Sequence, residues 1–290
     1  MAYKAVLTGE GLLILGSLLF CVSDSILAWD KFLASYSWCE FGIMLTYYAA
    51  QLCIAMAYVP SFKADYTPKG EKSTLGDIEC YMAGSKSSRR GIIVNYDIFG
   101  FHPNVIQICD ILGDFGFYVL LPDLLRGNPL TEADLGKPGV FSEFSKTRGS
   151  WETNKPMYNR ALKHMKENGI TEVGLLGFCW GAHVSVAALT ELKGLAGGAI
   201  VHPALIQPGD LGKVNAPLMV LPSKDEADFS EDFNSLKSKS FFSKCYMERF
   251  DDMFHGFCGA RGDWTNPEQA KRANDAIKLL TKFFLAIMPQ

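Results

Sequence analysis

One cysteine occupies a position where the sequence predicts a nucleophile. Cys179 is the middle residue of the segment 177–181, which reads Gly-Phe-Cys-Trp-Gly. The nucleophile elbow G-x-S-x-G has the same spacing, and it needs small flanking residues because its strained turn leaves no room for side chains. An apolar run, residues 173–176, precedes the motif, and residues 182–192 have helical character. We therefore predict a strand, a sharp turn and a helix with the Cys179 thiol at the apex; a buried structural cysteine is the alternative.

A cysteine nucleophile needs a base, and the base needs a carboxylate that orients it. In α/β-hydrolases these groups follow the chain order nucleophile, acid, histidine. Cys179, Asp225 and His255 have this order. Glu226 is a second candidate acid, and Asp225 is preferred because it comes first after the expected strand. His202 precedes both acids, so chain order makes it the poorer base, and we interpret it as a polar residue that caps a strand beneath the site.

Acyl transfer also needs hydrogen-bond donors for the oxyanion that develops on the substrate carbonyl. We expect one donor to be the backbone N–H of Trp180, the residue after the proposed nucleophile. A second is expected from the loop after an early strand, where Ile98 lies in the segment 96–100.

Strand-length apolar runs alternate with longer helical patterns through the C-terminal part of the chain. The expected strands are 77–83, 91–96, 117–121, 172–177, 198–201, 217–221 and 245–250. The expected helices are 103–114, 155–168, 182–192, 230–239 and 267–287. This alternation predicts an α/β fold with a mostly parallel, doubly wound sheet. Ligands bind at the carboxyl ends of the strands in such sheets, and each candidate triad residue follows an expected strand.

Composition and charge exclude several classes of function. The chain has 290 residues, of which 48% are hydrophobic and 20% charged, which favours a packed globular protein over disorder. A net charge of −3 and the lack of a long basic run give no reason to expect nucleic acid as a partner. The eight cysteines are scattered without C-x-x-C spacing, which favours a reducing compartment over a disulfide framework. The chemistry proposed for Cys179 requires no metal or other cofactor.

The first sixty residues differ from the rest. Residues 11–29 and 41–59 are almost wholly apolar, and each is about long enough to cross a bilayer as a helix. We predict a transmembrane helical hairpin at 1–60, a linker at 61–75 and the α/β domain at 76–290. A cleaved signal peptide and a buried hairpin of a soluble protein are the alternatives. Lysines outside the two spans predict a cytoplasmic α/β domain, which is cytosolic if the N-terminal segment is absent from the product.

The hairpin also resembles a membrane enzyme family. The segments 23–32, reading Ser-Asp-Ser-Ile-Leu-Ala-Trp-Asp-Lys-Phe, and 47–52, reading Tyr-Tyr-Ala-Ala-Gln-Leu, are similar to the last two spans of lysoplasmalogenases. Those multi-span enzymes cleave vinyl-ether lysolipids. Two spans cannot enclose such a site, so the resemblance implies a membrane anchor or the remnant of a fused gene. A lysoplasmalogenase-related membrane protein is kept as an alternative function.

The α/β domain resembles the dienelactone hydrolase family, including its carboxymethylenebutenolidase-like members. The resemblance rests on Asp-Ile-Phe-Gly at 97–100, Leu-Pro-Asp-Leu at 121–124, the elbow segment 174–181, His-Gly-Phe at 255–257 and Arg-Gly-Asp at 261–263. It implies an α/β-hydrolase fold and a Cys-Asp-His triad, here Cys179, Asp225 and His255. It also implies hydrolysis of lactones or small carboxylic esters through a thiol acyl-enzyme.

Three further roles come from this resemblance. Asp97 stands where the family places an acid that interacts with the nucleophile thiol, although bacterial members have a longer glutamate there. Arg126 and Arg261 lie near positions that hold a substrate carboxylate in the family. The alternative to an enzyme is a non-catalytic, membrane-tethered α/β-hydrolase-like domain that binds ligands or partners.

Overall fold

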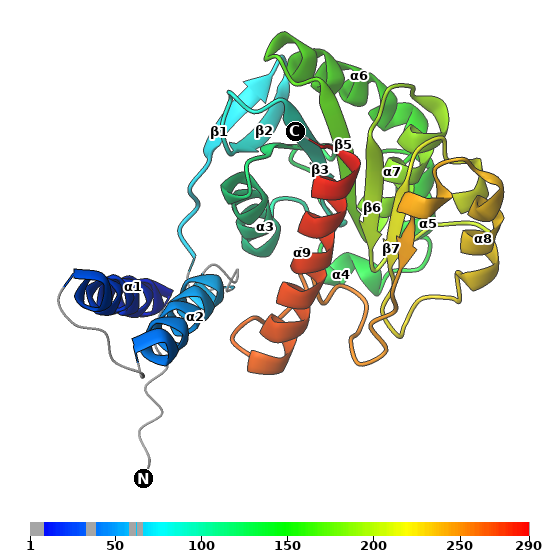
Figure 1. Cartoon of the computed structure of the whole chain (residues 1–290). Helices are drawn as coiled ribbons and strands as arrows, with labels where there is room; N and C mark the ends of the chain where they lie inside the picture. The colour runs from blue at the N-terminus through cyan, green and yellow to red at the C-terminus, as the bar shows by residue number, and fades with distance from the viewer. Residues whose placement is uncertain (1–8, 33–38, 58–61, 63–65, 290) are drawn as a thin grey trace. The chain divides into compact units, whose positions relative to one another are not determined.

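The computed structural model describes residues 9–32, 39–57, 62 and 66–289. Contacts divide the chain into two compact units, Met1–Ser61 and Phe62–Gln290. We call them the helical unit and the α/β unit (Figure 1). The α/β unit thus begins within the predicted linker rather than at residue 76.

The helical unit contains α1 (Gly9–Phe32) and α2 (Cys39–Ala57), which pack against each other. The Ser23 hydroxyl donates to the backbone carbonyl of Ile43 at 3.3 Å, and the rings of Phe20 and Tyr47 meet edge to face. Two helices were expected here, and residues 58–59 of the second predicted span lie outside the described residues. No helix in the described part of the chain is long and apolar enough to cross a membrane.

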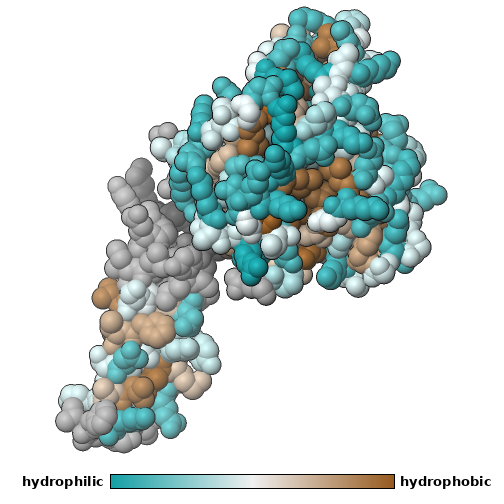
Figure 2. All heavy atoms as spheres, turned by 90° about the horizontal axis from the view of Figure 1, so that it is seen from above, coloured by the Kyte–Doolittle hydropathy of each residue, from teal (hydrophilic) through white to brown (hydrophobic). Residues whose placement is uncertain are grey.

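Large apolar side chains nevertheless lie on the surface of the helical unit (Figure 2). On α1 they are Leu15, Leu18, Val22, Leu27 and Trp29, and on α2 they are Phe41, Met44, Leu45, Tyr47 and Tyr48. Large apolar groups gathered on the surface of two helices are the usual mark of a surface that meets an apolar partner.

Eight strands within residues 66–289 form one sheet in the order β1-β2-β4-β3-β5-β6-β7-β8. They are β1 (Glu71–Leu75), β2 (Ile78–Ala83), β3 (Arg90–Asn95), β4 (Tyr118–Pro122), β5 (Glu172–Phe178), β6 (Gly197–Val201), β7 (Leu218–Leu221) and β8 (Tyr246–Met247). β2 pairs antiparallel with β1 and β4, and all other neighbours are parallel. The predicted α/β-hydrolase fold with a mostly parallel sheet is confirmed.

Helices cover both faces of this sheet (Figure 1). They are α3 (Pro103–Asp114), α4 (Glu132–Leu135), α5 (Val140–Lys146), α6 (Trp151–Glu167), α7 (Trp180–Glu191), α8 (Ser230–Asn234) and α9 (Pro267–Ile287). Gly174 and Gly177 show the two layers, because residues an odd number apart on a strand face opposite sides. A Cβ on Gly174 would meet Phe284 of α9, whereas one on Gly177 would meet Ser185 of α7. The central strands are therefore buried on both faces, which explains their continuous apolar runs.

The helices begin at recognisable caps. The Asn266 side chain accepts from the N–H groups of Glu268 and Gln269, and Pro267 occupies the first turn of α9. Ser150 caps α6 by accepting from the Thr153 N–H, so this helix starts four residues before the expected position. The helix expected at 230–239 ends at Asn234 and continues as a 3₁₀ turn, Ser235–Ser238.

Part of the predicted linker is ordered structure. Glu71–Leu75 forms β1, the edge strand beside β2. Ahead of it, the carboxylate of Asp110 accepts from the hydroxyls of Tyr66 and Tyr81 at 2.5 and 2.6 Å. The same carboxylate accepts from the backbone N–H groups of Lys69 and Gly70 at 2.9 and 3.2 Å. The polar composition that predicted a linker thus belongs to a segment fixed by one buried carboxylate.

Candidate active site

The turn between β5 and α7 has the geometry of a nucleophile elbow. Cys179 lies at its apex with φ 52° and ψ −116°, a strained backbone that costs about 1–3 kcal/mol. A Cβ on Gly177 would lie 2.4 Å from the carbonyl oxygen of Gly181, and one on Gly181 would lie 2.2 Å from that of Asn95. Both glycines are therefore required by close backbone approach, and the predicted strand, turn and helix are present.

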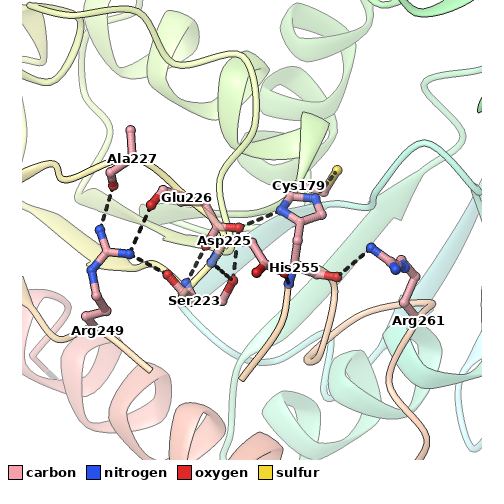
Figure 3. Close-up of polar contacts among 8 residues, drawn as sticks. All are labelled: Cys179, Ser223, Asp225, Glu226, Ala227, Arg249, His255 and Arg261. Carbon is pink, nitrogen blue, oxygen red and sulfur yellow. Dashed lines mark hydrogen bonds and ion pairs between the residues drawn. The ribbon is translucent and has the colours of Figure 1, made fainter. Parts of the chain in front are cut away.

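His255 lies between this thiol and a carboxylate (Figure 3). Its Nε2 atom is 3.1 Å from Sγ of Cys179, and its Nδ1 atom is 2.6 Å from Oε1 of Glu226. The Glu226 side chain is 5% exposed, so little water competes for this contact. One imidazole thus joins a thiol to a carboxylate, which is the arrangement that activates a cysteine nucleophile.

The carboxylate that faces the imidazole is Glu226 and not the expected Asp225. Asp225 instead accepts, through Oδ2, from the backbone N–H of His255 at 2.8 Å. The turn after β7 explains the difference. The Ser223 hydroxyl donates to Oε1 of Glu226 at 3.0 Å and the Ser223 N–H donates to Oε2, which folds the longer side chain toward the histidine. Glu226 therefore orients the ring, while Asp225 holds the main chain of the same residue.

These contacts favour a charged histidine. Burial lowers the pKa of His255, but the hydrogen bonds and charges of Cys179 and Glu226 outweigh burial and raise this pKa to about 10. An imidazolium that faces a sulfur atom stabilises the thiolate form of the cysteine. The contacts of His255 therefore favour its positively charged form beside Sγ of Cys179.

Two backbone N–H groups are expected to stabilise the oxyanion. That of Trp180 is close to the thiol in the chain, and that of Ile98 follows a strand that neighbours β5. Trp180 directly follows Cys179 at the start of α7, and Ile98 lies in the loop after β3, the strand next to β5. Among the hydrogen bonds of the described residues, neither the Trp180 nor the Ile98 N–H has an acceptor. Their role at the oxyanion remains a prediction.

Comparison with known families assigns most of the α/β unit. Residues 78–288 match the dienelactone hydrolase family, and residues 1–58 match the YhhN family. The first match covers more than half of the chain. The chain belongs to the dienelactone hydrolase family. It is therefore a hydrolase, and the YhhN match agrees with the lysoplasmalogenase-like resemblance of the first sixty residues.

Relatives in this family span most of the chain. An uncharacterised AIM2 family protein of Schizosaccharomyces pombe is 32% identical over 250 residues, which is 82% of this chain and 100% of that protein. A carboxymethylenebutenolidase homolog of Xenopus tropicalis is 26% identical and covers 74% of this chain and 90% of its own length. Among solved structures, a dienelactone hydrolase-like promiscuous phosphotriesterase from metagenomic libraries superposes with a TM-score of 0.54 at 17% identity, covering 74% of this chain and 97% of its own. The structural likeness supports the fold alone.

Asp97, which the family resemblance places beside the thiol, has its hydrogen bonds within the described residues to backbone amides, and its interaction with the thiol stays a prediction. Its side chain is 2% exposed, and its two carboxylate oxygens accept from the N–H groups of Phe99 and Ala260, each at 2.9 Å. Burial raises the pKa of Asp97, and these two amides oppose that rise. The short side chain is thus held by backbone amides, and it ties the Ile98 loop to the segment that follows His255.

The two candidate arginines have different surroundings. Arg261 is next to the site, because its Nη1 donates to the backbone carbonyl of His255 at 3.0 Å (Figure 3). Its guanidinium also lies over the ring of Phe254. Arg126 pairs with Asp77 at 3.6 Å, beside the turn between β1 and β2. No hydrogen bond or ion pair within the described residues joins Arg126 to Cys179 or His255, so of the two arginines only Arg261 contacts a residue of the site.

His202 lies beside the catalytic histidine candidate, in keeping with its interpretation as a residue beneath the site. Its ring meets that of His255 edge to face, with centroids 5.3 Å apart. It is fully buried, and neither ring nitrogen has a hydrogen-bond partner among the described residues. Burial holds the pKa of His202 well below its ordinary value, so the ring is neutral. Across the described residues, no set of three His, Cys, Asp or Glu side chains is arranged to hold a metal ion.

Proposed function

We propose that this hydrolase cleaves a lactone or small carboxylic ester through Cys179. The observation that carries the proposal is the single imidazole of His255, which contacts Sγ of Cys179 with one nitrogen and the Glu226 carboxylate with the other. The strained elbow supports it, because the turn presents the thiol at the carboxyl edge of the sheet, where substrates bind in α/β folds.

The first half-reaction forms a thioester. The thiolate of Cys179 attacks the carbonyl carbon, and the N–H groups of Trp180 and Ile98 stabilise the oxyanion. The tetrahedral intermediate collapses with cleavage of the carbon–oxygen bond to the alcohol. His255, as imidazolium, donates its Nε2 proton to the departing oxygen and becomes neutral.

The second half-reaction releases the acid. Neutral His255 accepts a proton from water at Nε2, and the resulting hydroxide attacks the thioester carbon. The carbon–sulfur bond then breaks, and the thiolate and the imidazolium are restored together. Glu226 keeps Nδ1 protonated throughout and stabilises the positive charge on the ring.

Hydrolysis of p-nitrophenyl acetate by the full chain tests this function. The wild type should form an acetyl adduct on the peptide that contains Cys179, visible by mass spectrometry after acid quenching. Cys179→Ala should lose both the adduct and the turnover, whereas Cys245→Ala, which changes a cysteine outside the site, should keep both. Full activity in Cys179→Ala would exclude the thiol mechanism, whereas a wild type with neither adduct nor turnover would favour the non-catalytic binding domain.

We further propose that the helical unit attaches the hydrolase to a membrane. The exposed apolar side chains of α1 and α2 and the YhhN match support this attachment. Flotation of the native protein with lipid vesicles tests it, because Leu18→Glu with Leu45→Glu should leave the protein at the bottom of the gradient. Equal flotation of wild type and variant would argue against attachment through these surfaces.

Protease treatment of sealed cells or organelles is a separate test of whether the α/β unit is cytoplasmic.

A further inference from the structure

Arg249 contacts the segment that supplies the carboxylate of the site. It follows β8, and its guanidinium donates to three backbone carbonyl oxygens of residues 223–227 (Figure 3). Nη1 is 2.5 Å from the oxygen of Ser223 and 3.1 Å from that of Glu226, and Nη2 is 2.5 Å from that of Ala227. The arginine side chain is 25% exposed, so these contacts are only partly shared with water.

The segment needs such donors because it has just left the sheet. Ser223 lies just beyond the end of β7 and forms an isolated parallel bridge to Phe250. Beyond it, the chain turns sharply to bring Glu226 back toward the Ser223 N–H and hydroxyl. A guanidinium presents several donors in one rigid plane, which suits carbonyls that converge from a turn. A lysine ammonium lacks this fixed fork.

This turn decides which of two adjacent carboxylates faces His255. Glu226 contacts Nδ1 of the ring, whereas Asp225 contacts the backbone N–H of the same residue. Neighbouring residues point in different directions, so a small rotation of the turn exchanges the two carboxylates or withdraws both. The contacts of Arg249 lie on both sides of this pair, at Ser223 and at Ala227.

We propose that Arg249 is a positioning residue that holds the turn 223–227 so that the Glu226 carboxylate stays against Nδ1 of His255. Its consequence for ester hydrolysis rests on the proposed function, whereas its effect on His255 does not. Arg249 acts through Glu226 and touches no reacting atom. Its loss should therefore lower kcat with little change in KM, and it should weaken the contact that favours the imidazolium.

The test compares Arg249→Gln, Arg249→Lys and the control Arg160→Gln in the full chain. Arg160 pairs with Asp77 at the β1–β2 turn, far from β7 in the sheet order. With p-nitrophenyl acetate, Arg249→Gln should lower kcat about 10- to 100-fold, the range expected when a catalytic group is misplaced by about an ångström. Arg249→Lys should fall between the wild type and Arg249→Gln, and Arg160→Gln should match the wild type.

The readout specific to positioning is the titration of His255 by NMR on ¹⁵N-labelled histidine, assigned with His255→Asn. In Arg249→Gln the pKa of His255 should fall from about 10 toward its value in Glu226→Gln. In the double variant that carries both substitutions, this pKa should equal that of Glu226→Gln alone. An unchanged midpoint in Arg249→Gln would overturn the proposal even if kcat fell, because a merely structural loss leaves the ring contact intact. If Arg249→Gln fails to fold, an unchanged midpoint in Arg249→Lys overturns it equally. Absence of Cys179-dependent hydrolysis in the wild type would reject the proposed function instead, and the titration would still decide the role of Arg249.

Discussion

Asp225 and Glu226 are adjacent carboxylates that hold different parts of one histidine. Glu226 contacts the ring nitrogen Nδ1, and Asp225 contacts the backbone N–H. The ring contact fixes which tautomer is present and stabilises the charged ring, whereas the backbone contact only fixes the position of the main chain. At the scale of residues, the two side chains are therefore separable by mutation.

Glu226→Gln should reduce kcat/KM far more than Asp225→Asn. Loss of the carboxylate that orients the histidine costs up to about 10⁴-fold in a serine triad, and we expect about 10²- to 10⁴-fold here. Asp225→Asn keeps an acceptor for the His255 N–H and should cost less than about 10-fold. Initial rates with p-nitrophenyl acetate measure both, and a larger loss in Asp225→Asn would return the triad acid to Asp225.

The pKa of His255 also predicts how stability depends on pH. Its folded value of about 10 is above the ordinary value of 6.5, so the folded protein holds more protons than the unfolded chain between these pH values. Stability from this group is fully present below about pH 6.5 and is lost as the pH rises through about 10. Urea unfolding of wild type and His255→Asn should show the advantage of the wild type shrinking across this window. An advantage that grows with pH would contradict a raised pKa of His255.

At the scale of elements, the site depends on how closely α7 approaches β3 and β5. Gly181 of α7 faces the carbonyl oxygens of Asn95 and Tyr96, with no space for a side chain. This approach sets the elbow directly beside the loop that carries Ile98. The geometry of the thiol and of the expected oxyanion donors is thus a property of helix–strand packing.

Gly181→Ala should destabilise the protein by about 1–3 kcal/mol or more, as overpacking of a tight core does. Gly136→Ala is the control, because no atom lies within 4 Å of its added Cβ and its φ is −77°. That substitution should be neutral or stabilise by about 0.4–1 kcal/mol. Urea unfolding measures both free energies, and equal effects would show that the close approach is not required.

The sequence predicts most of these elements because buried parallel strands leave long apolar runs. These runs locate the elbow and the carboxyl edge of the sheet, and they place Cys179 and His255 each after an expected strand. The sequence of β1, Glu-Lys-Ser-Thr-Leu, predicts a linker, because an edge strand can be as polar as a linker. Sequence order favours Asp225 over Glu226, because the choice depends on a turn whose carbonyl groups bind the guanidinium of Arg249, a contact between residues far apart in the chain. The contact of Asp97 with the N–H of Ala260 likewise joins residues far apart in the chain, so no local pattern predicts it.

At the scale of the whole molecule, the α/β unit includes the segment before residue 76, which supplies the edge strand of its sheet. β1 covers the edge of β2, and the segment from Tyr66 to Gly70 is fixed by Asp110. An exposed strand edge promotes pairing with other chains. The unit therefore needs the residues before position 76, although the sequence alone placed them in a linker.

A chain of residues 62–290 should remain monodisperse, and its kcat for ester hydrolysis should equal that of the full chain. A chain of residues 76–290 lacks β1 and the partners of Asp110, so it should unfold at a lower temperature and self-associate. Size-exclusion chromatography and thermal unfolding compare the two. Equal behaviour would show that β1 contributes nothing to the edge.

The first described residue of the α/β unit also provides an optical signal. Phe62 lies on the indole of Trp264, with ring centroids 3.6 Å apart, and the indole N–H donates to the carbonyl of Phe257 at 3.3 Å. Trp264 therefore joins the entry of the chain to the segment that begins at His255. Because the ring of Phe62 packs on this indole, Phe62→Ala should shift the fluorescence emission of Trp264, which makes the entry of the chain visible without any added dye.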